Sequence, residues 1–364
     1  MIRFIHASDL HLGRRFANIP ADETGVRGRL MEARHGAIGR IAQAARDHGA
    51  AHVLLAGDTF DTPTPSAGVV RQALAAMGED QGVTWWLLPG NHDNLREAEV
   101  LWETLSREAP ANVQSLTAAA PVAMGAAVLL PCPVAWRSSG EDATRAMPGM
   151  ESAEGAVRIG LAHGGVTDFT DSGAHIPPDR DRTARLDYLA LGDWHGRMAV
   201  GARVHYPGSP EQDRFRHNRR GGCLAVTVAG SGAVPDVAEV ETGQFLWSEA
   251  DLPLLPGQDA GAALAALLPQ TGRRDVLVRL RATGRLGLAE RSALMAAAAR
   301  VAPDFALFDL RDGDLATAVE VADLDAIDRA GALRLAAEEL QADGSKVATD
   351  ALARLYAFVT EDAP

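Results

Sequence analysis

The sequence predicts an α/β protein, and two observations support this. Short β-type runs alternate with helical patterns through the first two thirds of the chain, and such alternation is typical of layered α/β folds. Asp, His and Asn residues follow directly after several of these runs, at the sheet edge where α/β proteins bind ligands. The length of 364 residues, with 47% hydrophobic and 23% charged residues, suits two or three domains with full cores.

Apolar runs bounded by turn residues define the expected strands of this region, which are 2–6, 52–56, 83–88, 112–117, 126–130, 157–162, 187–191, 198–206, 222–229 and 234–241. Apolar residues at helical spacing predict helices over 28–48, 66–79 and 95–109. A second unit is expected to begin near Gln244, and Pro253, Pro256 and Gly257 indicate a linker.

The elements of this second unit follow the linker. Its predicted elements are a helix at 259–268, a strand at 275–282, a helix at 288–301, a strand at 305–311 and two helical stretches within 323–361. We therefore expect a main domain over 1–245, a small β-α-β domain over 246–322 and a C-terminal helical segment over 323–364.

Composition restricts the function classes. The net charge of −13 argues against a constitutive, strongly basic coat for nucleic acid. With only Cys132 and Cys223, a disulfide framework and a Cys-rich zinc site are not expected. The charge-free stretch 112–136 is interrupted by prolines, so we expect buried strands there and no membrane span. We expect a soluble chain in a reducing, cytoplasmic compartment.

Five short motifs combine Asp, His or Asn with Gly at strand ends. They are Asp9-Leu10-His11, Gly57-Asp58-Thr59-Phe60-Asp61, Gly90-Asn91-His92-Asp93, Ala162-His163-Gly164 and Gly192-Asp193-Trp194-His195. Carboxylates and imidazoles bind catalytic divalent metals, and this mixture suits manganese, iron or zinc better than calcium. In an extended backbone, Asp9 and His11 would leave the same face.

Each motif alone has an ordinary structural explanation. A Gly-Asp pair is common in turns, Gly-Asn-His-Asp can form an Asx turn with a surface His, and His163 can be a satisfied core histidine. The order and the strand-end placement of all five motifs together favour metal binding.

The motif series D-x-H, G-D-x-x-D, G-N-H-D, a later His with Gly, and a final pair ending in His resembles the calcineurin-like metallophosphoesterase superfamily over roughly 1–245. Ile5–Gly13, Tyr206–Glu211 and the β-α-β unit further resemble the branch of DNA-repair exonucleases that includes bacterial SbcD. The resemblance implies a four-layered β-sandwich core flanked by helices, with 246–322 as a capping domain.

The resemblance also implies a dimetal site. One ion would be held by Asp9, His11, Asp58 and His195, and the second by Asp58, Asn91, His163 and the residue at 193. His92 would approach the phosphate and donate a proton to the leaving oxygen, while Asp93 would orient the His92 ring.

Position 193 departs from the family pattern, because the family has His where this chain has Asp193. A carboxylate can bind the second ion directly or through water, and it favours a harder ion. We therefore expect two divalent ions, manganese first, with iron, magnesium or zinc as alternatives. The competing interpretation is a weak or absent second site.

Several other residues have two open interpretations. Arg14 and Arg15 follow the first motif and could contact DNA phosphates. The densest basic cluster, with Arg214, Arg216, Arg219 and Arg220, could contact phosphates or lie on a solvated loop. Asp61 could support the Asp58 loop or be an exposed turn residue, Trp194 could pack or stack on a base, and His6 is expected in the core.

The lead hypothesis is a manganese-dependent DNA exonuclease subunit. The resemblance of the sequence to the SbcD branch implies a homodimer that works with an SbcC-like coiled-coil ATPase. It places the dimer contact near 95–109. The alternative for 95–109 is packing on its own sheet, and the C-terminal helices could dock on the ATPase or pack on the cap. The rival functions are a phosphodiesterase or phosphatase for small nucleotides, and a DNA-end-binding scaffold with a decayed metal site.

Overall fold

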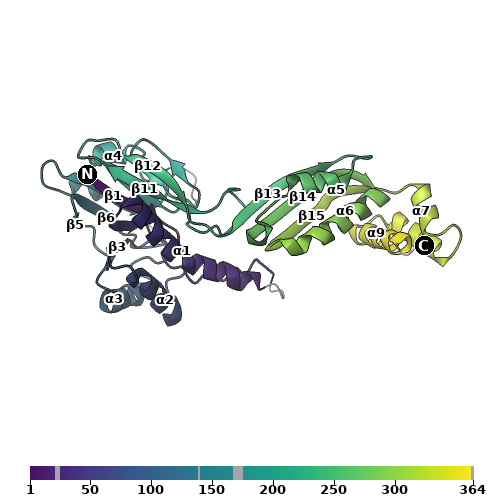
Figure 1. Cartoon of the computed structure of the whole chain (residues 1–364), viewed down its shortest axis with the longest axis horizontal. Coiled ribbons are helices and arrows are strands. Elements are labelled where there is room, and N and C mark those ends of the chain that lie inside the picture. Colours follow the sequence, from purple (N-terminus) through teal and green to yellow (C-terminus); the bar gives the residue numbers. More distant parts are fainter. Residues whose placement is uncertain (21–24, 138–139, 167–174, 362–364) are drawn as a thin grey trace. The chain divides into compact units, whose positions relative to one another are not determined.

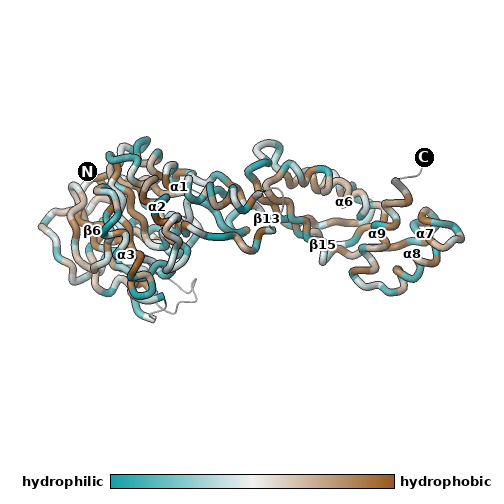
Figure 2. The backbone as a smooth tube through the Cα atoms, turned by 90° about the horizontal axis from the view of Figure 1, so that it is seen from below, coloured by the Kyte–Doolittle hydropathy of each residue, from teal (hydrophilic) through white to brown (hydrophobic). Residues whose placement is uncertain are grey.

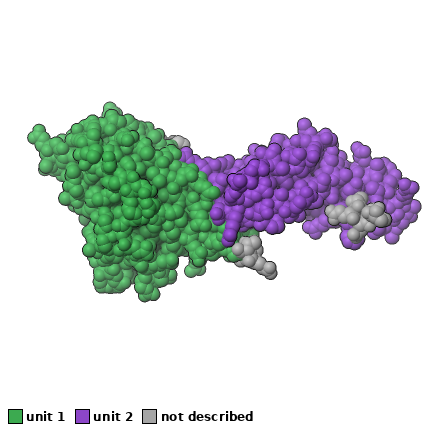
Figure 3. Space-filling model, in the orientation of Figure 1, with its two compact units in different colours: residues 1–213, 220–245 green, residues 214–219, 246–364 purple. Residues whose placement is uncertain are grey.

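The computed structural model describes residues 1–20, 25–137, 140–166 and 175–361 (Figure 1). The chain divides into two compact units (Figure 3). The first consists of 1–213 and 220–245, and the second of 214–219 and 246–364. The segments 246–322 and 323–364 therefore lie in one unit.

Within the described residues, the first unit contains two six-stranded sheets. The first has the order β12-β11-β1-β2-β3-β4 and comprises β1 (Ile2–Ala7), β2 (His52–Leu55), β3 (Thr84–Leu87), β4 (Val113–Ser115), β11 (Gly222–Val228) and β12 (Asp236–Glu241). The second has the order β5-β6-β7-β8-β10-β9 and comprises β5 (Val122–Met124), β6 (Ala127–Cys132), β7 (Val157–His163), β8 (Tyr188–Gly192), β9 (Met198–Ala199) and β10 (Val204–Tyr206).

The two sheets pack face to face, and helices cover the outer face of the first. Along β1, Phe4 lies in the core between the sheets and Ile5 in the core beneath the helices, as the two-residue period of a strand requires. The helices are α1 (Val26–His48), α2 (Ala67–Gly78) and α3 (Glu99–Glu108), with a short α4 (Arg180–Thr183) and a 3-10 turn at Met147–Gly149 beside the second sheet. This confirms the predicted layered α/β fold.

Strand direction places the predicted motifs together. β1, β2 and β3 are parallel neighbours in the first sheet, and β7 and β8 are parallel neighbours in the second. Each of the five motifs follows, or closes, one of these strands. Their carboxyl ends therefore supply the loops of a single site.

One local expectation needs correction. Residues 198–206 form two short antiparallel strands, β9 and β10, rather than one strand. In 95–109, Leu101, Trp102 and Leu105 are buried in the core beneath the first sheet, which favours the alternative that this helix packs on its own sheet. The dimer contact near 95–109 stays a prediction.

The second unit has a parallel sheet of three strands in its described part, in the order β13-β14-β15. Its elements are β13 (Leu246–Leu254), α5 (Ala260–Leu267), β14 (Val276–Gly287), α6 (Leu288–Val301), β15 (Leu307–Ala318), α7 (Val321–Ile327), α8 (Ala332–Asp343) and α9 (Lys346–Glu361), with 3-10 turns at Arg273–Asp275 and Ala302–Asp304. The expected linker is wrong at Pro253, because β13 extends to Leu254 as an edge strand, where a proline is tolerated. Pro256 and Gly257 lie in the short connection between β13 and α5.

The C-terminal helices pack on their own unit. Ala337 of α8 and Leu352 of α9 share a buried cluster with Leu288 and Leu324. Hydrophobic stretches gather inside both units, and hydrophilic stretches lie mostly on loops (Figure 2). None of the helices in the described part of the chain is long and apolar enough to cross a membrane.

Candidate metal centre

The first loop of the centre follows β1. Asp9 and His11 are buried, with backbone φ angles of 56° and 44°. The loop is therefore turned rather than extended. The expectation that Asp9 and His11 leave the same face of an extended backbone is wrong. Backbone hydrogen bonds from Asp9 N to Gly57 O (3.1 Å) and from His11 N to Asp58 O (2.9 Å) fasten it to the loop after β2.

The loops after β2 and β3 fit together through Asp58 and Gly90. Asp58 accepts a hydrogen bond from His92 N at its Oδ1 atom (2.9 Å) and also has a positive φ of 54°. A Cβ atom on Gly90 would lie 2.2 Å from Asp58 Oδ1. Glycine is required there because any side chain would displace this carboxylate.

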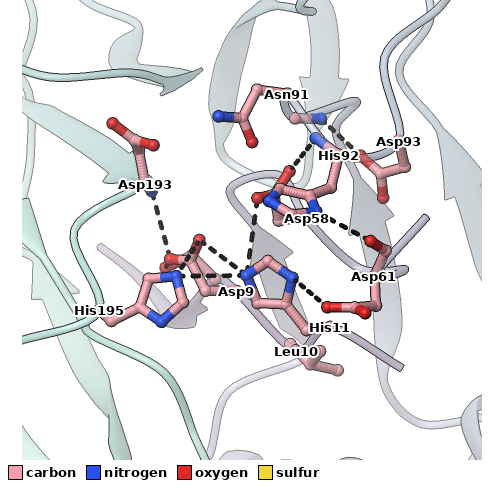
Figure 4. A network of polar contacts seen from close by, with 12 residues as sticks. Asp9, Leu10, His11, Asp58, Asp61, Asn91, His92, Asp93, Asp193 and His195 are labelled. Carbon is pink, nitrogen blue, oxygen red and sulfur yellow. Dashed lines mark hydrogen bonds and ion pairs between the residues drawn. The ribbon is translucent and has the colours of Figure 1, made fainter. Parts of the chain in front are cut away.

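One group of donors surrounds His11 Nε2. This atom lies 3.3 Å from His195 Nε2, 3.6 Å from Asp58 Oδ2 and 3.9 Å from Asp9 Oδ1. Figure 4 shows these side chains pointing toward one another. Donors bound to one ion at about 2.1 Å are roughly 3.0–3.4 Å apart, so the observed spacing is close to that of a metal shell. We call this group site one.

A second group surrounds His163 Nε2, which lies 3.6 Å from Asp58 Oδ2 and 3.8 Å from Asp193 Oδ1. His163 Nδ1 donates a hydrogen bond to Ala56 O (2.8 Å), so the Nε2 lone pair faces the carboxylates. Asp58 Oδ2 is thus near the histidines of both groups. With Asn91, these residues form what we call site two.

Unpartnered buried atoms show that both sites fit metal ions. Asp9 Oδ1, Asn91 Oδ1 and His163 Nε2 are buried without a hydrogen-bond partner among the described residues. Buried polar atoms are normally paired, because an unpaired one costs about 1–3 kcal/mol. All three are oxygen or nitrogen donors of the kind that divalent metals bind.

The pKa shifts of the buried side chains also indicate that the sites fit metal ions. Burial lowers the pKa of His163, but the nearby Asp58, Asp9 and Asp193 carboxylates outweigh it and raise that pKa to about 9. Burial also raises the pKa of Asp58 well above its usual range and raises the pKa of Asp193. A buried carboxylate ionises more readily when a cation lies beside it, and a divalent ion would supply that positive charge.

His92 lies beside site one. Its Nδ1 donates a hydrogen bond to the backbone oxygen of Asp61 (2.8 Å), and its ring packs edge-on against His11, with centroids 4.7 Å apart. The expectation that Asp93 orients this ring is wrong. Asp93 is fully buried and accepts hydrogen bonds from Gly90 N (2.7 Å) and Phe60 N (3.0 Å), so it joins the two loops instead.

Two carboxylates take part that the motifs did not assign. Asp61 Oδ1 lies 3.2 Å from His11 Nδ1, which favours the supporting role over the exposed-turn alternative. Asp213 Oδ2 lies 3.3 Å from His195 Nδ1 and is nearly fully buried. Sequence reasoning missed Asp213, whose one signal is its position soon after the Tyr206–Glu211 segment.

The arginines expected at DNA have different surroundings. Arg14 is part-buried and contacts Asp61 and Asp213, and both Arg14 and Arg15 line a cleft beside the centre. Arg220 donates a hydrogen bond to the backbone oxygen of Gln244. Arg214, Arg216 and Arg219 belong to the second unit, where Asn218 exchanges hydrogen bonds with the backbone of Glu249 in β13.

The cleft beside the centre has a volume of about 840 Å³. His92 and Asp61 of the centre line it, and so do Arg14, Arg15, Asn18, Met31 and Ser66. Trp194 is not among its lining residues and packs against the outer core of the second sheet. The cleft therefore leads from the metal sites along the loop after β1.

Two packed sheets thus carry, at their strand ends, side chains that could hold metal ions. Residues 2–220 match the calcineurin-like phosphoesterase family, and the chain belongs to that family. The uncharacterized metallophosphoesterase YhaO of Bacillus subtilis strain 168 is 26% identical over 239 residues, which are 62% of this chain and 57% of that protein. The chain thus spans just over half of this relative's length.

Among solved structures, TT1561 of Thermus thermophilus aligns with 65% of this chain and 98% of its own, at 12% identity and a TM-score of 0.41.

Proposed function

We propose that this phosphoester hydrolase is a DNA exonuclease that uses two divalent ions, with manganese as the preferred metal. The observation that carries the proposal is the pair of donor groups that share Asp58, with buried unpartnered atoms at Asp9, Asn91 and His163. Ions held there would polarise a phosphodiester and lower the pKa of a bound water.

The protein's own residues supply positioning and proton transfer. Because His92 Nδ1 donates to Asp61 O, a protonated ring presents its second N–H at Nε2. We propose that this N–H protonates the leaving oxygen, a role worth about 10²–10⁴-fold in rate. Asp93 holds the loop that carries His92.

The cleft favours a polymer over a small nucleotide as substrate. It extends from His92 to Asn18 and Ser66, so there is room beside the scissile phosphate for further nucleotides. Arg15, on its wall, supplies a charge that suits a phosphate backbone.

One experiment separates this function from its rivals. The full chain with Mn²⁺ is incubated with end-labelled linear DNA, and in parallel with a chromogenic diester and monoester. We expect degraded DNA, and no degradation by Asp58→Asn. Turnover of small esters alone would support a nucleotide phosphodiesterase, and DNA binding without cleavage would support a scaffold with a weakened second site at Asp193.

We further propose a homodimer that works in the cytoplasm with an SbcC-like coiled-coil ATPase. The support is the resemblance carried by Ile5–Gly13 and Tyr206–Glu211. Light scattering after size-exclusion chromatography tests the dimer. Co-expression with a coiled-coil ATPase encoded beside this gene tests the complex, and a monomer that elutes apart from the ATPase would contradict both.

A further inference from the structure

In site one, His11 and His195 each have a carboxylate beside Nδ1, the ring nitrogen that faces away from the shared donor group. His11 Nδ1 lies 3.2 Å from Asp61 Oδ1, and His195 Nδ1 lies 3.3 Å from Asp213 Oδ2. Such outer carboxylates fix the ring orientation and strengthen the metal-facing nitrogen. Their own positions therefore matter for metal binding.

Arg14 joins these two carboxylates. Its Nη1 atom lies 3.4 Å from Asp61 Oδ1 and 3.2 Å from Asp213 Oδ2. Since His11 Nε2 and His195 Nε2 are 3.3 Å apart, the five side chains close a ring: His11, Asp61, Arg14, Asp213 and His195. One guanidinium nitrogen thus connects both supports of site one.

The neighbouring arginine does not make these bonds. Arg34 is fully buried, and its Nη1 and Nη2 atoms donate to Leu10 O (2.6 Å) and to the backbone oxygen of Glu211 (3.0 Å). Asp213 is 1% exposed, and an ionised carboxylate at that depth needs a nearby cation. Arg14 lies within ion-pair distance of Asp213, and the positive charge of Arg34 nearby adds to this stabilisation.

The backbone holds Arg14 in place. Its N–H donates to His11 O (3.2 Å), and Gly13 has a φ of 90° that a side chain would strain. The Arg14 guanidinium also lies over the Phe16 ring at 5.9 Å. The side chain is 26% exposed where it lines the cleft, and these contacts hold its guanidinium against the two carboxylates.

We propose that Arg14 is a positioning residue for site one, not a contact for the DNA backbone. It holds Asp61 and Asp213 against the two histidines, and it offsets negative charge that would repel an anionic substrate. This inference rests on the proposed function for the presence of two metal sites. It is an alternative to the prediction that Arg14 contacts phosphate.

The test is Mn²⁺ binding to the metal-stripped full chain without substrate, by isothermal titration calorimetry. Asn91→Ala leaves site one for measurement, and His195→Ala leaves site two. In the first background, we expect Arg14→Gln to weaken Mn²⁺ binding by about 10–100-fold, and in the second by less than about threefold. Arg14→Lys should recover most of the affinity, because a single cationic nitrogen makes both contacts.

Arg46→Gln is the matched control, because it removes an arginine–carboxylate pair with Asp80 on the surface of α1. It should leave both affinities unchanged. Arg14→Met keeps the apolar stem, so it should repeat the Gln result if one variant folds poorly. Unchanged site-one affinity with a higher KM for DNA would overturn the proposal in favour of a phosphate contact. Failure to degrade DNA with normal Mn²⁺ binding would contradict only the proposed function.

Discussion

His6 of β1 should make the first unit sensitive to acid. The side chain is fully buried between the sheets, where Nδ1 faces the Tyr188 hydroxyl (3.0 Å) and Nε2 faces Leu191 O (3.2 Å). A carbonyl only accepts, so Nε2 donates and Nδ1 accepts from Tyr188. Burial, aided by His205, lowers the pKa of His6 to about 3 from its ordinary value of 6.5.

The sign and size of the effect follow from linkage. The folded chain keeps His6 neutral, whereas the unfolded chain protonates it below pH 6.5, so stability is present above that pH and is lost as pH falls toward 3. Between pH 7 and pH 5, His6 is protonated in the unfolded form but not in the folded form. This protonation lowers the free energy of unfolding by about 2 kcal/mol, because pH 5 lies about 1.5 units below the ordinary pKa.

The assay is urea unfolding in EDTA at pH 7 and pH 5, for the wild type and His6→Gln. Tryptophan fluorescence reports mainly the first unit, because Trp247 alone lies in the second. The wild type should lose about 2 kcal/mol more than the variant, since the other histidines titrate in both proteins. Equal pH dependence, or an NMR titration of the His6 ring in the folded protein near pH 6, would refute the reasoning.

Four further predictions concern the metal centre. His92→Ala should keep full metal content by elemental analysis but lower kcat about 10²–10⁴-fold; unchanged turnover would refute the proton-donor role. Asp193→His should raise the affinity of site two for Zn²⁺ relative to Mn²⁺, and a wild-type chain that binds a single ion would contradict a complete second site. Because His163 has a pKa raised to about 9, filling site two at pH 7.5 should release about one proton, measured by calorimetry in two buffers, and none above pH 10. Gly192→Ala would place a Cβ atom 1.9 Å from Ala56 O and 2.8 Å from His163 Nδ1, so it should cost about 1–3 kcal/mol and weaken site two, whereas Gly201→Ala, with open space around its Cβ, should do neither.

The sequence determined the layered α/β fold and named most of the side chains that the structure gathers. This was possible because each motif is short and follows an apolar strand, so local pattern and sheet topology together place it. Asp9, His11, Asp58, His163 and His195 all converge as the strand-end argument required. The strand β13 was missed because Pro253 within it, and Pro256 and Gly257 just after it, resemble a linker.

Only the tertiary structure decided which groups support the metal-binding side chains. The second ring nitrogen of a metal-binding histidine pairs with a group on a neighbouring loop. The sequence around the histidine does not indicate which loop that is. Asp213 reaches His195 across 18 residues of chain, Arg14 reaches Asp61 and Asp213 from a third loop, and the backbone of Asp61 takes the place expected for Asp93. These contacts exist because separate loops meet at one sheet edge, and their geometry is set by packing rather than by spacing in the sequence.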